Sequence, residues 1–244
     1  MTVSYPEFVA ATRREGEGLL TAARIGLDAP VPTCGEWTVG DLLSHVSRIY
    51  RFVATAVHDR ATAAPARPEI PDGADLIDYA ESALDDLVEA LGGVDPQTPV
   101  WNWSHQEQVA GFWARRMAQE SLVHRWDAQN AHGIAQRIEP ELAADGLDEL
   151  FDVLMPRILE RDFPDRSTIP SVSLGLHASD IDRQWRVALS PAGFDPQAPG
   201  PAEVDLTGSA PRLLLTVYGR IGLDAIELTG SAAALDTWRG ALHF

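Results

Sequence analysis

The stretch RRMAQESLVHRWDAQ, Arg115 to Gln129, lies in the longest helical pattern of the chain, Val109 to about Ala131. The apolar residues of this pattern do not form a clean stripe, because polar residues interrupt them. Glu120 and His124 are four residues apart, and Asp127 follows about one turn later. Side chains four apart on a helix are neighbours, with Cβ atoms about 5–6 Å apart, so Glu120 and His124 can converge on one point. The stretch therefore predicts a helix whose polar side chains have a role beyond packing against the core.

Apolar residues at helical spacing predict four more helices in the first 160 residues. Their approximate ranges are Pro6–Ile25, Val39–His58, Asp75–Leu91 and Pro140–Leu159. Thr38, with Asp41 three residues later, is a capping-box start for the second of these helices. Loops and turns rich in Pro, Gly and Ala separate the helices, so this part of the chain is expected to fold as an antiparallel helix bundle.

Strand patterns replace helix patterns after residue 160. SVSLGLHA, residues 171–178, and RQWRVALS, residues 183–190, alternate apolar with small or polar residues, as half-buried strands do. AEVDLTG (202–208) and IELTG (226–230) are two further short strands, and SAPRLLLTVYGR (209–220) and SAAALDTWRGAL (231–242) are helices. The expected fold is a helix bundle over residues 1–160, followed by a small α+β domain over residues 161–244.

Composition excludes some classes of partner. The chain has 244 residues, with 36 acidic and 19 basic side chains and a formal net charge of −17. Such a field repels nucleic acid and anionic membrane surfaces, so neither is expected as a partner. The single cysteine, Cys34, excludes an internal disulfide and any multi-cysteine metal site, as suits a reducing cytoplasm. No signal-peptide pattern and no run of about 18 apolar residues is found, so a soluble cytoplasmic protein is expected.

A divalent metal ion is a natural occupant of the point where Glu120 and His124 converge. Zinc takes imidazole nitrogen and carboxylate oxygen at about 2 Å, and a catalytic zinc site has three protein ligands and an open position. His45 is the best third ligand, because it lies three residues after Leu42 and four before Ile49 and shares their core-facing side. A set of two histidines and one carboxylate also suits iron, nickel or manganese.

Simpler interpretations stand beside the metal site. A glutamate and a histidine four residues apart often occur by chance, as a surface pair or with a hydrogen-bonded core histidine. Asp127 either orients the imidazole of a ligand histidine or forms a salt bridge within the same run. Arg115, Arg116 and Arg125 are either counter-charges for the acidic residues or, for one of them, a binding group for an anionic substrate.

Two blocks of the sequence carry a resemblance to a known family. VPTCGEWTVGDLLSHV, residues 31–46, and ARRMAQESLVHRWDAQNAHG, residues 114–133, resemble the diagnostic blocks of the mycothiol-dependent maleylpyruvate isomerase family, whose N-terminal part is a DinB-like four-helix bundle. The family pattern falls on Trp37, His45, Glu120, His124, Arg125 and Asp127. The resemblance implies that His45, Glu120 and His124 bind zinc or another divalent ion.

The resemblance extends to the C-terminal part of the chain. PRLLLTVYGRIGLDAIELTGSAAALDTW, residues 211–238, is similar to the small C-terminal domain of the family. Arg220 matches an arginine implicated in the isomerase reaction, which implies that it binds a substrate carboxylate or stabilises developing negative charge. A structural arginine that caps nearby carbonyl groups is the other interpretation. Residues 58–105 match the family in pattern only.

For function, the resemblance implies an enzyme that uses a divalent metal ion, with zinc as first choice, and the low-molecular-weight thiol mycothiol as cosubstrate. The metal stabilises a thiolate that attacks a small electrophilic molecule, which can carry a carboxylate, and the outcome is isomerisation or S-transfer. Two other functions stay open: a metal-dependent hydrolase that activates water, and a non-catalytic small-molecule binding or sensor protein. The oligomeric state stays open as well.

Overall fold

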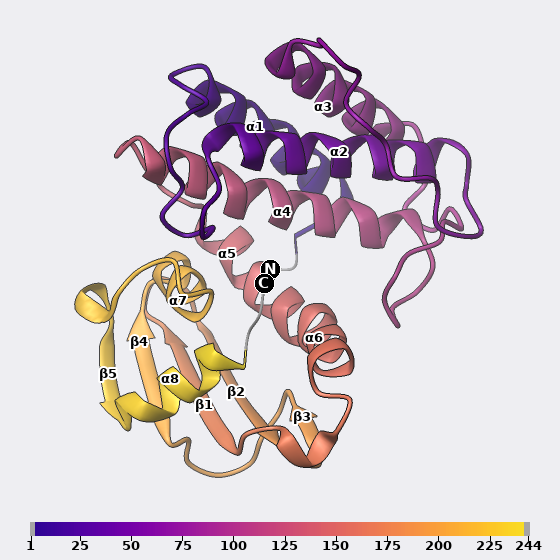
Figure 1. The fold of residues 1–244 in the computed structure, drawn as a ribbon. Coiled ribbons are helices and arrows are strands. Elements are labelled where there is room, and N and C mark those ends of the chain that lie inside the picture. Colours follow the sequence, from indigo (N-terminus) through magenta and orange to yellow (C-terminus); the bar gives the residue numbers. More distant parts are fainter. Residues whose placement is uncertain (1–2, 242–244) are drawn as a thin grey trace. The chain divides into compact units, whose positions relative to one another are not determined.

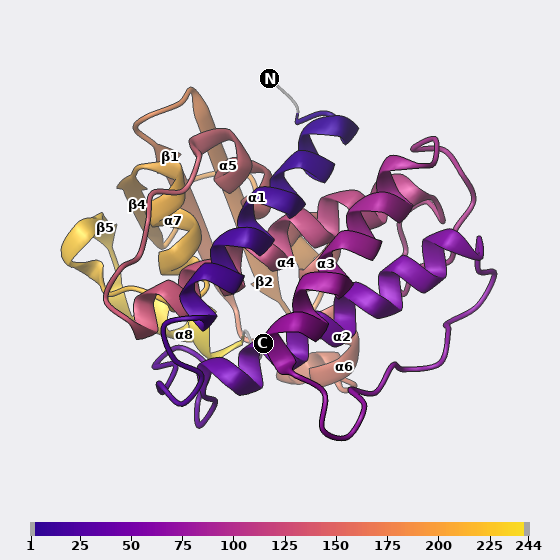
Figure 2. The same cartoon turned by 90° about the horizontal axis from the view of Figure 1, so that it is seen from above.

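The computed structural model describes residues 3–241, which form two compact units. The first unit, Val3–Gln136, holds four helices that lie side by side (Figure 1, Figure 2). They are α1 (Tyr5–Ala23), α2 (Val39–His58), α3 (Leu76–Gly92) and α4 (Ala110–Ala131). Helix α1 packs along α4 and α2 packs along α3, with further contacts between α2 and α4. The expected four-helix bundle is confirmed.

Local caps determine where two of these helices begin. The Thr38 side chain accepts a hydrogen bond from the backbone N–H of Asp41, and the Asp41 carboxylate accepts one from the backbone N–H of Thr38. At α3, the Asp75 carboxylate accepts hydrogen bonds from the N–H groups of Ile77 and Asp78. Each cap satisfies backbone donors that have no partner inside the helix. Within the described chain, every helix is too short or too polar to span a lipid bilayer.

Gly18 allows α1 to approach α4 closely. A Cβ atom at this position would lie 2.5 Å from Cδ of Arg125, which is closer than van der Waals contact allows. The Arg125 side chain crosses α1 at this glycine and forms a buried ion pair with Glu15 of α1. The glycine is therefore needed because a charged side chain from α4 has to reach its partner across the helix surface.

Trp113 of α4 joins the bundle to the connection between α3 and α4. Its side chain is 2% exposed, and its indole N–H donates a hydrogen bond to the carbonyl oxygen of Trp101 at 2.7 Å. The rings of Phe52 and Phe112 lie edge-on to it, with centroids 6.2 Å and 5.2 Å away. This aromatic cluster holds the connection against α2 and α4.

The second unit begins at Arg137, earlier than the boundary at residue 160 that the sequence led us to expect. Its first helical segment comprises α5 (Pro140–Glu149), a π-helical turn (Leu150–Leu154) and α6 (Met155–Asp162). Helix α5 packs against α7 (Ala210–Val217) of the same unit. An amphipathic pattern shows that a helix has a buried face but does not show which partner buries it. Pro156 accounts for the π-helical turn, because proline lacks an N–H and its ring clashes with the preceding turn.

A five-stranded sheet in the order β3-β2-β1-β4-β5 completes the second unit. The strands are β1 (Val172–Ala178), β2 (Arg183–Ser190), β3 (Gly193–Asp195), β4 (Val204–Gly208) and β5 (Glu227–Gly230). Strands β1 and β4 are parallel, and the other pairs are antiparallel. Helices α7 and α8 (Ala232–Gly240) contact β1 and β4. The expected α+β architecture is confirmed; β3 was missed because three residues are too few for an alternating pattern.

The burial of Trp113 predicts a large loss of stability on truncation. Trp113→Ala removes a side chain that fills the bundle core, and we expect the free energy of unfolding to fall by about 3–5 kcal/mol. The measurement is urea unfolding followed by far-ultraviolet circular dichroism. Ile25→Ala is the control, since Ile25 is 58% exposed and its loss should cost less than about 0.5 kcal/mol. Equal losses in the two variants would contradict the proposed core.

Candidate metal centre

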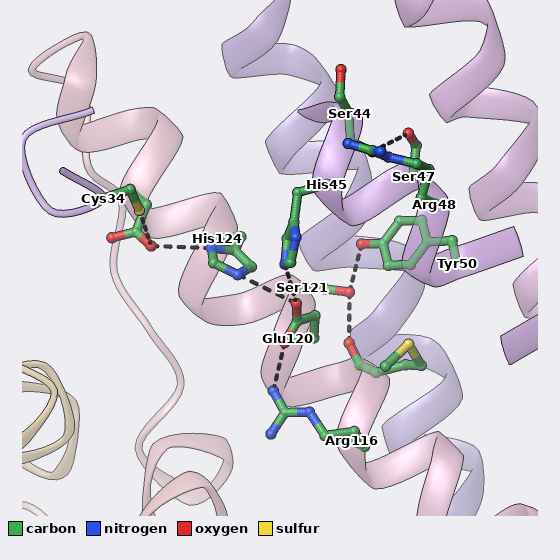
Figure 3. Close-up of polar contacts among 12 residues, drawn as sticks. Cys34, Ser44, His45, Ser47, Arg48, Tyr50, Arg116, Glu120, Ser121 and His124 are labelled. Atoms are coloured by element: carbon green, nitrogen blue, oxygen red, sulfur yellow. Dashed lines mark hydrogen bonds and ion pairs between the residues drawn. The ribbon is translucent and has the colours of Figure 1, made fainter. Parts of the chain in front are cut away.

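His45, Glu120 and His124 converge inside the bundle (Figure 3). His45 lies on α2, and the other two residues lie one turn apart on α4. Oε1 of Glu120 is 3.3 Å from Nε2 of His45 and 3.3 Å from Nε2 of His124. The two imidazole rings are nearly perpendicular, with centroids 5.5 Å apart. The structure thus brings together the three residues that the sequence singled out as metal ligands.

The spacing of these three atoms suits a metal ion. Around a tetrahedral ion with ligands at about 2.0–2.1 Å, neighbouring ligand atoms lie about 3.3–3.4 Å apart. The two distances to Oε1 of Glu120, both 3.3 Å, agree with this spacing. They are long for charge-assisted hydrogen bonds, which are typically about 2.7–2.9 Å. The donor set therefore fits a divalent ion, and three protein ligands leave a position open for another molecule.

The centre is more accessible at His45 than at α4. The side chains of Glu120 and His124 are 14% and 13% exposed, whereas that of His45 is 37% exposed. The indole ring of Trp37 lies beside His45, with ring centroids 5.0 Å apart, and Trp37 is itself partly exposed. The most exposed edge of the centre is therefore the one that His45 and Trp37 form.

Asp127 holds the far side of the His124 ring. Its Oδ2 lies 3.2 Å from Nδ1 of His124, which leaves Nε2 directed at Glu120. The Thr33 hydroxyl donates to Oδ1 of Asp127 at 2.6 Å, and the Cys34 thiol donates to Oδ2 with an Sγ to oxygen distance of 3.6 Å. Asp127 is fully buried, so these donors replace the water that its carboxylate has lost. Asp127 lies where a carboxylate that orients a ligand histidine has to lie.

Cys34, His124 and Asp127 form a second group of metal-ligand type among residues 3–241. This group shares His124 with the first but faces its other ring nitrogen. Both oxygens of Asp127 already accept hydrogen bonds from Thr33 and Cys34, so this carboxylate is satisfied without an ion. Among residues 3–241, the first group is therefore the candidate that we carry forward. Sequence reasoning found no role for Cys34, because nothing in its spacing shows that its turn folds against α4.

Two buried arginines near the centre pair with acidic side chains. Nη2 of Arg116 donates to Oε2 of Glu120 at 2.9 Å, and Arg125 pairs with Glu15 of α1. The sequence left open whether these arginines are counter-charges for acidic residues or bind an anionic substrate. The contacts in the structure are those expected of counter-charges. For Arg116, the four-residue spacing to Glu120 was a signal that sequence reasoning did not use.

Charged neighbours shift two pKa values of the centre in opposite directions. Burial by itself would raise the pKa of Glu120, but His124, hydrogen bonds from both histidines and the charge of Arg116 hold that pKa well below 4.5. Burial would lower the pKa of His124, but the charge of Glu120 and the hydrogen bond with Asp127 hold it well above 6.5. The metal-free centre is therefore a carboxylate beside an imidazolium.

Residues 9–129, nearly the whole first unit, match the family model of the mycothiol maleylpyruvate isomerase N-terminal domain. The chain belongs to the mycothiol maleylpyruvate isomerase family. Among solved structures, a crystal structure of the mycothiol-dependent maleylpyruvate isomerase is similar, with 15% identity and a TM-score of 0.64 over 96% of this chain and 98% of that chain. A histidine-to-alanine mutant of mycothiol-dependent maleylpyruvate isomerase gives 15% identity, a TM-score of 0.63 and the same coverage.

The two comparisons cover different parts of this family member. The family model matches residues of the first unit, whereas the structural likeness extends over both units. At 15% identity, that likeness shows the fold alone. Among curated protein sequences, none matches the chain significantly.

Arg220, which the family resemblance also singled out, follows α7 in the second unit. The helix ends at Val217. Gly219, two residues later, has a φ of +70°, and the backbone N–H of Arg220 donates to the carbonyl of Leu215 at 2.8 Å. Nη1 of Arg220 donates to the carbonyl of Tyr218 at 3.1 Å, and its guanidinium carbon lies 5.6 Å from the centroid of the Tyr218 ring. The carbonyl contact matches the structural interpretation, and a role toward substrate is a proposal.

The pKa shifts predict how the stability of the metal-free protein depends on pH. The raised pKa of His124 stabilises the folded state fully below the unfolded value of 6.5, and this stabilisation is lost as the pH rises through the folded pKa. The lowered pKa of Glu120 stabilises the folded state above 4.5, and this is lost as the pH falls through its folded pKa. We therefore expect the free energy of unfolding, measured in urea, to fall as the pH rises above about 6.5.

Two variants locate this effect. His124→Gln removes the imidazolium and should flatten the dependence above pH 6.5. His58→Gln changes a histidine whose side chain is 83% exposed at the end of α2, and it should keep the dependence of the wild type. A wild-type stability that does not change over this pH range would show that the pKa of His124 is not raised.

Proposed function

We propose that the chain is a divalent-metal-dependent enzyme that uses mycothiol either to isomerise a small electrophilic molecule or, as an S-transferase, to add mycothiol to it through its sulfur. The observation that carries the proposal is the convergence of three side chains, in which Oε1 of Glu120 lies 3.3 Å from Nε2 of His45 and 3.3 Å from Nε2 of His124. Membership in the mycothiol maleylpyruvate isomerase family supports the choice of thiol. We also propose zinc as the ion and the cytoplasm as the location, the latter because only one cysteine is present.

Each residue of the centre has a role in holding or orienting the ion. His45, Glu120 and His124 would hold it. Asp127 accepts the Nδ1–H of His124, so the Nε2 lone pair is the one that faces the ion. When bound, the ion would supply Lewis acidity, which would favour the thiolate form of mycothiol at neutral pH. The partly exposed edge formed by Trp37 and His45 is the side from which thiol and substrate would enter.

The outcome of the proposed reaction is decided by the step after thiolate addition. Addition to an unsaturated substrate turns a carbon–carbon double bond into a single bond, about which rotation is free. Expulsion of the thiolate then breaks the C–S bond and restores the double bond with the other geometry, whereas S-transfer keeps the C–S bond and ends when the anionic adduct takes up a proton. Arg220 is proposed to bind a substrate carboxylate or to stabilise negative charge. A local cation is needed because the net charge of −17 opposes an anionic substrate.

Metal analysis tests the ligand assignment. We expect about one divalent ion per wild-type chain and none in a Glu120→Ala, His124→Ala double variant, because only one of three ligands remains. His58→Ala removes an exposed histidine outside the centre and should leave the metal content unchanged. The same metal content in the wild type and the double variant would show that the ligand assignment is wrong.

Assays of the zinc-loaded protein with maleylpyruvate and other small electrophiles, each with and without mycothiol, test the reaction. We expect turnover only in the presence of the thiol. Hydrolysis without any thiol would favour a metal-dependent hydrolase instead. Absence of metal uptake, together with unchanged thermal stability of a His45→Ala variant, would favour a non-catalytic binding or sensor protein.

Arg220→Gln tests the substrate role of Arg220. Loss of a hydrogen bond to a charged group costs about 1.5–3 kcal/mol, so we expect kcat/KM for a carboxylate-bearing substrate to fall by about 10–100-fold. Metal content should stay that of the wild type. Arg212→Gln is the matched control, since Arg212 also belongs to the α7 segment and donates to a backbone carbonyl, that of Ala225. Equal falls in kcat/KM for both variants would indicate a structural role for Arg220.

A further inference from the structure

Glu120 divides its two carboxylate oxygens between the histidines and an arginine (Figure 3). Oε1 faces Nε2 of both histidines, and Oε2 accepts a hydrogen bond from Nη2 of Arg116 at 2.9 Å. Arg116 lies four residues before Glu120 on α4, so both side chains lie on one face of the helix. Arg116 therefore contacts one oxygen of Glu120, and the other oxygen lies toward the histidines.

Stability alone is a poor reason for this buried pair. The side chain of Arg116 is 9% exposed and that of Glu120 is 14% exposed. An exposed ion pair on a helix contributes little to stability, and a buried one loses solvation that its attraction often fails to offset. A buried arginine at this position is better explained by a need to hold one particular carboxylate in one orientation.

We propose that Arg116 is a positioning residue of the metal centre, which holds Oε2 of Glu120 so that Oε1 is the oxygen offered to the ion. The inference rests on the proposed function, because it requires His45, Glu120 and His124 to bind a metal ion. A free glutamate side chain loses rotational freedom when it becomes a ligand, and a carboxylate that is already held loses less. Partners of this kind contribute about 10–100-fold to metal affinity.

Two substitutions separate the charge of Arg116 from its directionality. The guanidinium is planar and donates in set directions, whereas the ammonium of lysine is a point charge on a flexible stem. Arg116→Lys keeps the charge but loses the direction of the hydrogen bond, and Arg116→Gln loses the charge. If Arg116 orients Glu120, both variants bind the ion more weakly, and Arg116→Gln is affected more.

The test measures zinc affinity of the full chain by competition with a chromophoric chelator. The absorption spectrum of the cobalt(II)-loaded protein reports the set of ligand atoms. Arg116→Gln is expected to bind zinc about 10–100-fold more weakly than the wild type and to change the cobalt(II) spectrum. Arg125→Gln is the matched control, because it removes another buried arginine of α4, paired with Glu15 outside the ligand cluster. It should unfold at lower urea concentration but keep the zinc affinity and the spectrum.

Wild-type zinc affinity and spectrum in Arg116→Gln would overturn the proposal. An equal loss of affinity in Arg125→Gln would overturn it too, because that loss would reflect general destabilisation. If Arg116→Gln does not fold, Arg116→Lys decides: weaker zinc binding at wild-type stability supports the proposal, and wild-type affinity overturns it.

Glu120→Gln distinguishes a failure of the metal-ligand assignment from a failure of the role proposed for Arg116. Wild-type zinc affinity in this variant would mean that the metal centre itself is wrong, and the role of Arg116 would fall with it. Weaker binding in Glu120→Gln together with wild-type binding in both Arg116 variants would overturn the role of Arg116 alone.

Discussion

Charged side chains buried on α4 need partners, and those partners come from three other segments. A charge removed from water costs several kcal/mol unless it is paired and hydrogen-bonded, on the order of the whole stability of a domain. Glu120 meets His45 of α2, and Arg125 meets Glu15 of α1. Asp127 accepts hydrogen bonds from Thr33 and Cys34 in the turn before α2. The pairing of these charges therefore orients α1, α2 and the turn with respect to one helix.

The two α4 residues of the candidate metal centre are held in the same way. Each directs one atom inward and uses its other polar atom for support: Glu120 through Oε2 to Arg116, and His124 through Nδ1 to Asp127. Both supporting residues are buried, and both come from α4 itself. A site built on one regular helix keeps its geometry more closely than a site on loops, because the helix backbone sets the spacing of the side chains. His45 is the ligand that tertiary packing has to supply.

Fold and function rest on different observations in this family member. The likeness to mycothiol-dependent maleylpyruvate isomerase covers both units but shows the fold alone, and the family model matches residues 9–129 only. Function belongs to the site, so the reaction has to be inferred from donor atoms and their spacing. In the first unit these atoms suit a divalent ion. In the second unit, Arg220 has its own contacts with Tyr218, which orient its guanidinium at the end of α7.

Local signals in the sequence determined the helix and strand positions and most of the candidate site. The Thr38 cap, the spacing of Glu120 and His124, and the place of His45 on an apolar stripe all depend on residues within about one turn of each other. Only the tertiary structure showed that α5 belongs to the second unit. The apolar face of a helix shows that the helix packs against something, but it does not show which element it packs against. The tertiary structure also decided that Thr33 and Cys34 meet Asp127, which lies more than 90 positions later in the chain. The physical reason is that short-range geometry acts through the backbone, whereas the choice of distant partners depends on which packing buries every apolar face and pairs every buried charge.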